Sequence, residues 1–104
     1  MAWTYLLLAG LLEVVWAFSM KQSQGFTQLG PSVVTAVAMA GSVVLLALAM
    51  RSLPLGTAYM IWTGIGAVGA FVVGVTVLGE ALTTQRVIAA ALIVAGMLTM
   101  KAAS

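Results

Sequence analysis

The sequence predicts an all-α integral membrane protein, in which each chain forms one domain of four transmembrane helices covering residues 1–104. Hydrophobic residues make up 63% of the chain and charged residues 6%, whereas a soluble domain has about 25% charged residues and needs polar groups to cover its surface. The apolar residues also fall into long runs separated by short links. Such a pattern is typical of successive membrane spans.

The four predicted helices cover residues 3–20, 33–50, 55–78 and 83–100. The first three come from apolar runs close to the ~20 residues that are needed to cross a hydrocarbon core. The fourth run, 87–100, is too short alone, so we extend it to residue 83 on the expectation that Arg86 snorkels to the interface. A polar link containing Gly25 and Pro31 separates the first two helices, and the later links are shorter. Short links make sequential helices antiparallel neighbours.

The composition excludes most kinds of chemistry. The chain has no cysteine and no histidine, and only two acidic residues, so we expect no metal site, no cofactor and no enzymatic activity. Its four basic residues are scattered, which is not the surface of a nucleic-acid-binding protein.

Glu13 is the one charged residue inside an apolar run. A charge at mid-membrane depth costs roughly 2.5–3.5 kcal/mol on insertion scales and usually marks a functional site. No basic residue of the chain lies at the same depth, so the partner of Glu13 must be a proton, a solute cation or water. A carboxylate that holds a proton and releases it for an incoming cation predicts an exchanger in which both compete for one site.

Small and aromatic residues surround Glu13 in the predicted arrangement. Gly10 and Trp16 share its helix face, and Tyr59 and Trp62 share a face of the third helix, where their rings can attract a cation. Ser42, in the middle of the second helix, could hydrogen-bond to a carboxylate and orient it. The two tryptophans could instead belong to an interfacial belt, and Ser42 could bond to a carbonyl of its own helix. The predicted site for a proton or a flat cation is Glu13, Gly10, Trp16, Ser42, Tyr59 and Trp62.

The basic residues are balanced between the two sides of the membrane. Arg51 and Lys101 would lie on one side, and Lys21 and Arg86 on the other, which is too even to fix the orientation firmly. Chains inserted both ways up could pair as an antiparallel homodimer. On the sequence alone, we favour the alternative that a further signal gives every copy one orientation.

A second copy would also provide walls and a second carboxylate around Glu13. Small residues let helices approach closely in lipid. Ala89 and Gly96, two turns apart in the fourth helix, are therefore the predicted dimer contact, although such residues also pack helices within one chain.

Several motifs together resemble one known family. The segment 56–67 (GTAYMIWTGIGA) resembles the third-helix signature of the small multidrug resistance transporters. Glu13 in the first helix, the Lys21 link with the sequence GFT, and the Pro-Ser start of the second helix agree with that resemblance. The segments 13–17 (EVVWA) and 62–66 (WTGIG) resemble the guanidinium-exporter branch of the family.

The resemblance implies an antiparallel, dual-topology homodimer in the bacterial inner membrane. It also implies export of guanidinium in exchange for protons, with Glu13 of both subunits binding either cation and the other predicted site residues lining the pocket. The Gly64 and Gly66 pair resembles the family's bend in the third helix. The expected partners are guanidinium, protons, a second copy and membrane lipid. The alternatives are a broader exporter of quaternary ammonium cations on the same scaffold and a small membrane subunit that transports nothing.

Overall fold

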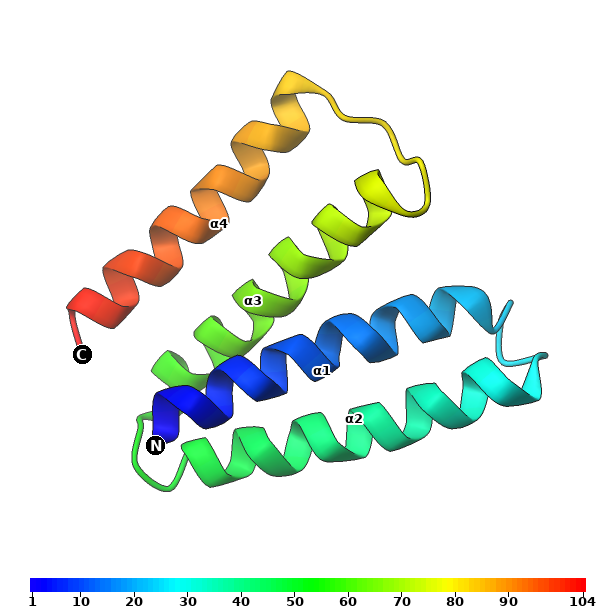
Figure 1. The fold of residues 1–104 in the computed structure, drawn as a ribbon. Coiled ribbons are helices and arrows are strands. Elements are labelled where there is room, and N and C mark those ends of the chain that lie inside the picture. The colour runs from blue at the N-terminus through cyan, green and yellow to red at the C-terminus, as the bar shows by residue number, and fades with distance from the viewer.

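The computed structural model describes all residues, 1–104, and consists of four α-helices. They are α1 (Ala2–Gln22), α2 (Leu29–Ala49), α3 (Leu55–Thr76) and α4 (Thr84–Ala102) (Figure 1). By length and composition, each is long and apolar enough to cross a membrane. The predicted all-helical chain with four candidate membrane spans is confirmed.

The helix ends differ from the predicted ones where local chemistry intervenes. α2 begins at Leu29 rather than at residue 33, because Pro31 falls in the first turn, where backbone N–H groups have no partner within the helix and a missing one costs little. α3 ends at Thr76 rather than at residue 78. The start of α4 is fixed by Thr83, whose side chain accepts a hydrogen bond from the Arg86 backbone N–H at 3.2 Å.

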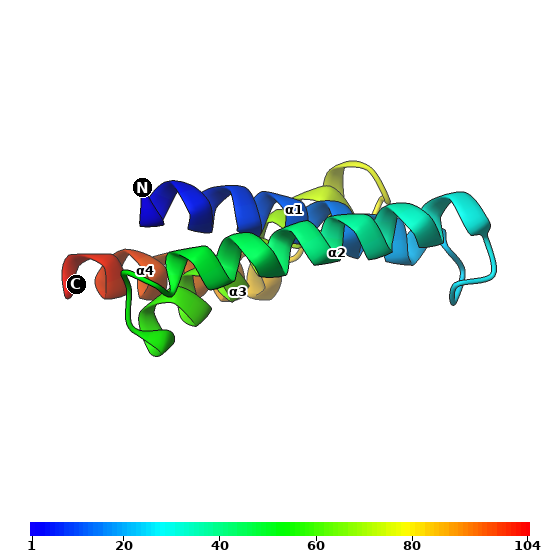
Figure 2. The same ribbon diagram turned by 90° about the horizontal axis from the view of Figure 1, so that it is seen from below.

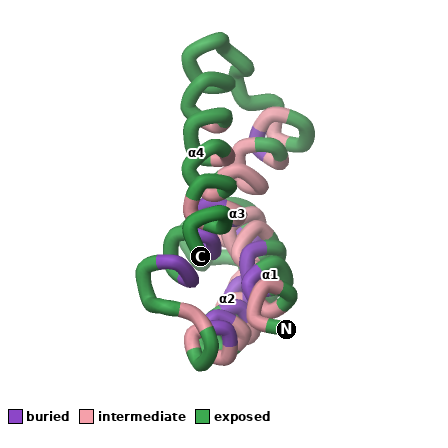
Figure 3. Tube along the Cα trace, turned by 90° about the vertical axis from the view of Figure 1, so that its left-hand side faces the viewer, coloured by how far each residue is buried: buried purple, intermediate pink, exposed green.

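The helices form a thin slab that measures 40 × 34 × 16 Å (Figure 2). α1 packs along α2 and also against α3, whereas the backbone of α4 approaches α3 alone. In Figure 1, α1 and α3 diverge toward the link between α3 and α4. No residue of α4 is buried (Figure 3), so this helix has apolar surface on most of its circumference and must face lipid or another protein.

The core lies where α1, α2 and α3 meet. Seven buried residues form it, and three of them are alanines that let the helices approach closely. They are Leu6, Ala9, Leu46, Ala49, Ala58, Ile61 and Trp62. Only 17 of the 104 residues are buried, so most apolar side chains point outward, as expected where lipid replaces water as the solvent. The core places α1 and α3 close together at the depth of Glu13.

Candidate functional site

Glu13 lies in the middle of α1 with its side chain against the backbone of α3. A Cβ atom added at Gly66 would overlap the Glu13 carboxylate. The carboxylate can occupy this position only because residue 66 has no side chain, and so α3 fixes where the acid of α1 lies.

Two polar atoms at this site are buried and have no hydrogen-bond partner within the chain: Glu13 Oε1 and Trp16 Nε1. Leaving a buried polar group unpaired costs about 1–3 kcal/mol, and such groups in a folded protein call for an explanation, for example a catalytic or ligand-binding role. One is an acceptor and the other a donor, and the two residues are one turn apart on α1. The pair indicates a binding site.

Ser42 and Trp62 tie the three inner helices together next to this pair. The Trp62 Nε1–H donates to Ser42 Oγ at 2.9 Å, and the Ser42 hydroxyl donates to the Ala9 carbonyl at 2.7 Å. We expected Ser42 to orient a carboxylate or to bond within its own helix. Its proton instead goes to α1, one turn from Glu13, because the helices cross closely enough for it to reach another backbone.

The aromatic residues differ in their accessibility. Trp62 is 9% exposed and bonded to Ser42, which contradicts the interfacial-belt interpretation for this residue. Tyr59 is 51% exposed, and its ring lies 5.5 Å from that of Trp62 at an interplanar angle of 60°. Within one chain, therefore, Tyr59 extends the aromatic wall to the surface and does not close a pocket around Glu13.

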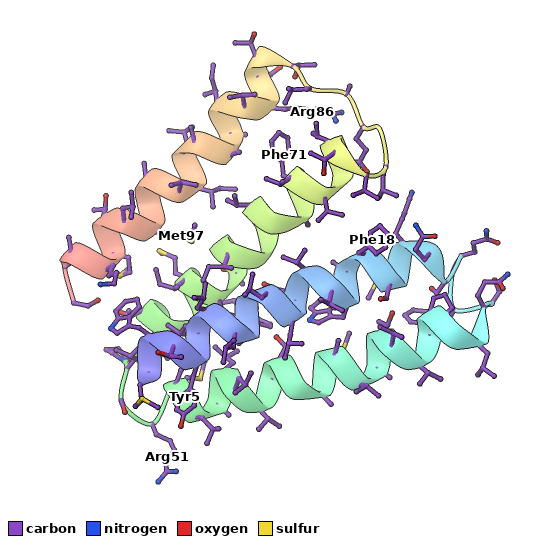
Figure 4. All side chains as sticks on the ribbon, viewed as in Figure 1. Tyr5, Phe18, Arg51, Phe71, Arg86 and Met97 are labelled. Atoms are coloured by element: carbon purple, nitrogen blue, oxygen red, sulfur yellow. The ribbon has the colours of Figure 1, made fainter.

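At the glycines of the site, a side chain of another helix lies against the backbone. A Cβ at Gly10 would overlap Ile65, and a Cβ at Gly64 would overlap Met97 of α4; Figure 4 labels Met97, which points from α4 toward α3. α3 is one continuous helix through Gly64 and Gly66. The sequence does not predict the contacts that Gly64 and Gly66 make with Met97 and Glu13. The sequence feature that indicates such contacts is the spacing of Gly10 and Glu13. These residues lie one turn apart on α1, opposite the adjacent Ile65 and Gly66 of α3.

No basic side chain neutralises Glu13 within the chain. The four basic residues are all exposed and lie at helix ends. One of them, Lys101 in the last turn of α4, places its ammonium 5.0 Å from the centre of the Trp3 ring. Trp3 lies near the start of α1, almost three turns before Glu13. The predicted dimer contacts on α4, Ala89 and Gly96, are both exposed. That contact remains a prediction.

The pattern of the family described as "Small Multidrug Resistance protein" matches residues 1–93. The chain belongs to the small multidrug resistance family. It is therefore a multi-pass membrane protein of a transporter family and not an enzyme.

Relatives within this family are similar over the whole chain. It is 56% identical to the guanidinium exporters of Yersinia pseudotuberculosis and Yersinia pestis over 104 residues, which is all of this chain and all of each relative. It is 54% identical to the guanidinium exporter of Escherichia coli over 101 residues, covering 97% of this chain and 96% of that protein.

Proposed function

We propose that this member of the small multidrug resistance family exports guanidinium across the bacterial inner membrane in exchange for protons, with Glu13 binding either cation. The observation that carries the proposal is the buried and unpartnered Glu13 Oε1 in a helix long and apolar enough to span a membrane. Relatives that match the whole chain at 56% identity are named guanidinium exporters. Guanidinium is therefore the cation that we assign to the site.

The chemistry of guanidinium suits the residues present. It is planar and always charged at physiological pH, and its N–H groups pair with a carboxylate in a two-pronged arrangement. The Trp62 N–H is already bonded to Ser42, so the indole is fixed in orientation and offers its ring face to a cation. Protonation of Glu13 removes the charge that holds the cation, so proton and guanidinium exclude each other. A transporter that switches this site from one side of the membrane to the other only when the site is occupied then exchanges the two cations.

Trp16 supports a second copy at the site. Its buried N–H needs an acceptor, and guanidinium has only donors. In an antiparallel homodimer, the second Glu13 could supply that acceptor. The exposed Tyr59 and the uncovered α4 also favour a partner of the same sequence. We propose that the dimer is closed through α4, at Ala89 and Gly96, and that α3 bends at Gly64 and Gly66 where the two copies differ in shape.

Uptake into liposomes that contain the purified chain alone tests this function. With a proton gradient imposed by a pH jump, we expect guanidinium to accumulate in the compartment that loses protons, and we expect Glu13→Gln to abolish accumulation while the protein stays folded. A small subunit without transport activity would give no uptake. A passive channel would give flux without proton movement, and stronger uptake of a bulky quaternary ammonium ion would favour the broader exporter.

A further inference from the structure

A cavity lies between the C-terminal halves of α1 and α3, beyond Glu13. α1 and α3 touch at Glu13 and Gly66, and again where a Cβ at Gly69 would overlap Val14. Beyond that point the helices diverge (Figure 1) and leave a cavity of about 320 Å³. Its walls include Ala17 and Phe18 of α1 and Ala70 and Phe71 of α3; Figure 4 labels both phenylalanines. The alanines leave room, and the rings provide apolar walls.

The mouth of this cavity carries one charge of each sign. Lys21 lies in the last turn of α1, and Glu80 follows the end of α3; both line the cavity. The Glu80 backbone N–H donates to the Gly74 carbonyl at 2.9 Å, and a Cβ at Gly74 would overlap the Glu80 carboxylate. The chain therefore folds back so that the acid lies against α3.

We propose that this cavity, in the part between Lys21 and Phe71, binds a phospholipid whose headgroup carries both a phosphate and a primary ammonium, such as phosphatidylethanolamine. The C-terminal ends of α1 and α3 are at the same end of the bundle, so Lys21 and Glu80 lie at headgroup depth while the apolar walls lie at acyl-chain depth. The Lys21 ammonium pairs with the phosphate, and the Glu80 carboxylate accepts from the lipid ammonium. An acyl chain fills the space between Phe18 and Phe71.

The distribution of charge favours a lipid over the transported cation. Guanidinium has no apolar part, so the apolar walls below the mouth contribute little to its binding, and the positive charge of Lys21 repels it. A lipid with a purely anionic headgroup would satisfy Lys21 but place its charge beside Glu80. Only a headgroup of both signs matches both side chains. Glu13, Trp16 and Trp62 do not line this cavity, but Val14 and Ala17 do. The cavity therefore adjoins the proposed transport site without containing its acid or its indoles.

Native mass spectrometry of the intact protein with matched phosphatidylethanolamine and phosphatidylglycerol tests the proposal. We expect phosphatidylethanolamine to bind more tightly, and Lys21→Glu or Glu80→Lys alone to weaken that binding by at least about tenfold, because each removes one charge-assisted hydrogen bond and adds a like-charge repulsion. The double variant exchanges the two charges and should restore the affinity. Arg51→Glu, which changes an exposed arginine that does not line the cavity, and Glu13→Gln should bind lipid as the wild type does.

A variant that fills the cavity gives an independent measurement. Ala70→Phe should weaken binding of phosphatidylethanolamine while leaving the helix content unchanged by circular dichroism. Equal binding of the two lipids, or a charge-exchanged double variant as weak as the single ones, would overturn the proposal. Displacement of the lipid by guanidinium would assign the cavity to transport instead. Efficient cross-linking of two copies through Phe18→Cys would show that a second chain covers it.

Discussion

Glu13 depends on residues of two other helices for its position. Gly66 leaves the space that its carboxylate occupies, and Ser42 joins Ala9, one turn away on the same helix, to Trp62. The first contact fixes where the acid lies and the second fixes the indole beside it. Changing either should alter binding without touching the acid itself.

Gly66→Ala should weaken guanidinium binding, because the new methyl group overlaps the Glu13 carboxylate and overpacking of this kind costs about 1–3 kcal/mol. Glu13→Asp shortens the acid by one methylene and should partly restore binding in the double variant. Isothermal titration calorimetry of the four proteins measures the coupling. The matched control is Gly69→Ala, which meets Val14 and should gain nothing from Glu13→Asp. If the shorter acid rescued both alanine variants equally, Gly66 would not act through the carboxylate.

Ser42→Ala should lower the thermal stability of the protein, because it leaves the buried Trp62 N–H without an acceptor. The expected cost is about 1–3 kcal/mol, seen as a lower unfolding temperature and altered tryptophan fluorescence. Ser32→Ala is the control, since the Ser32 hydroxyl bonds only to the Gln28 carbonyl of the preceding turn and is exposed. Equal effects of the two substitutions would contradict the role assigned to Ser42.

At the scale of the helices, the apolar runs predict each element, and local spacing predicts that Gly10, Glu13 and Trp16 share a face. The contacts between helices depend on how the helices cross. Nothing in the spacing along one helix reveals that Ser42 reaches Ala9, or that Gly66 receives the Glu13 side chain, because both contacts depend on how α1, α2 and α3 lie against one another. The predicted start of α2 at residue 33 is too late for a simpler reason: Pro31 lies within the first turn of the helix, which tolerates proline.

α4 has the least support within the chain. Its backbone approaches α3 alone, and none of its residues is buried. Its apolar surface must therefore be covered by lipid or by a second copy. Because small residues favour close helix contacts in lipid, the dimer contact predicted at Ala89 and Gly96 belongs to this helix.

Gly96→Phe should shift the protein from dimer to monomer in size-exclusion chromatography with light scattering. Nothing lies within 4 Å of a Cβ built at Gly96, but the residue lines a cavity with Thr63 and Gly64 of α3. Unchanged helix content by circular dichroism must therefore accompany the shift. Gly30→Phe is the control, because residue 30 is equally open but lies at the start of α2. A Gly96→Phe protein that stays dimeric would move the dimer contact elsewhere.

For the whole molecule, the two basic residues on each side of the membrane leave little to choose between the orientations. The structure of one chain leaves α4 uncovered, and the proposed antiparallel dimer would cover it with a chain inserted the other way up. Transport should therefore require chains in both orientations.

Adding lysines to one side tests this requirement. Gln22→Lys with Gln85→Lys adds charge to one set of links, and Ser52→Lys with Ala103→Lys adds it to the other, all at exposed positions. Each double variant should insert in a single orientation and lose protection against guanidinium in a growth assay. Expressing both together should restore it. Full protection from either variant alone would contradict antiparallel pairing.

The most direct test of the central claim is the release of protons when guanidinium binds the purified protein in weakly buffered solution. If Glu13 holds a proton or guanidinium but never both, adding guanidinium should release protons from the wild type and none from Glu13→Gln. The affinity for guanidinium should fall as the pH is lowered, because protonated carboxylates no longer attract the cation. Guanidinium binding with no proton release, at an affinity that does not change with pH, would contradict the account.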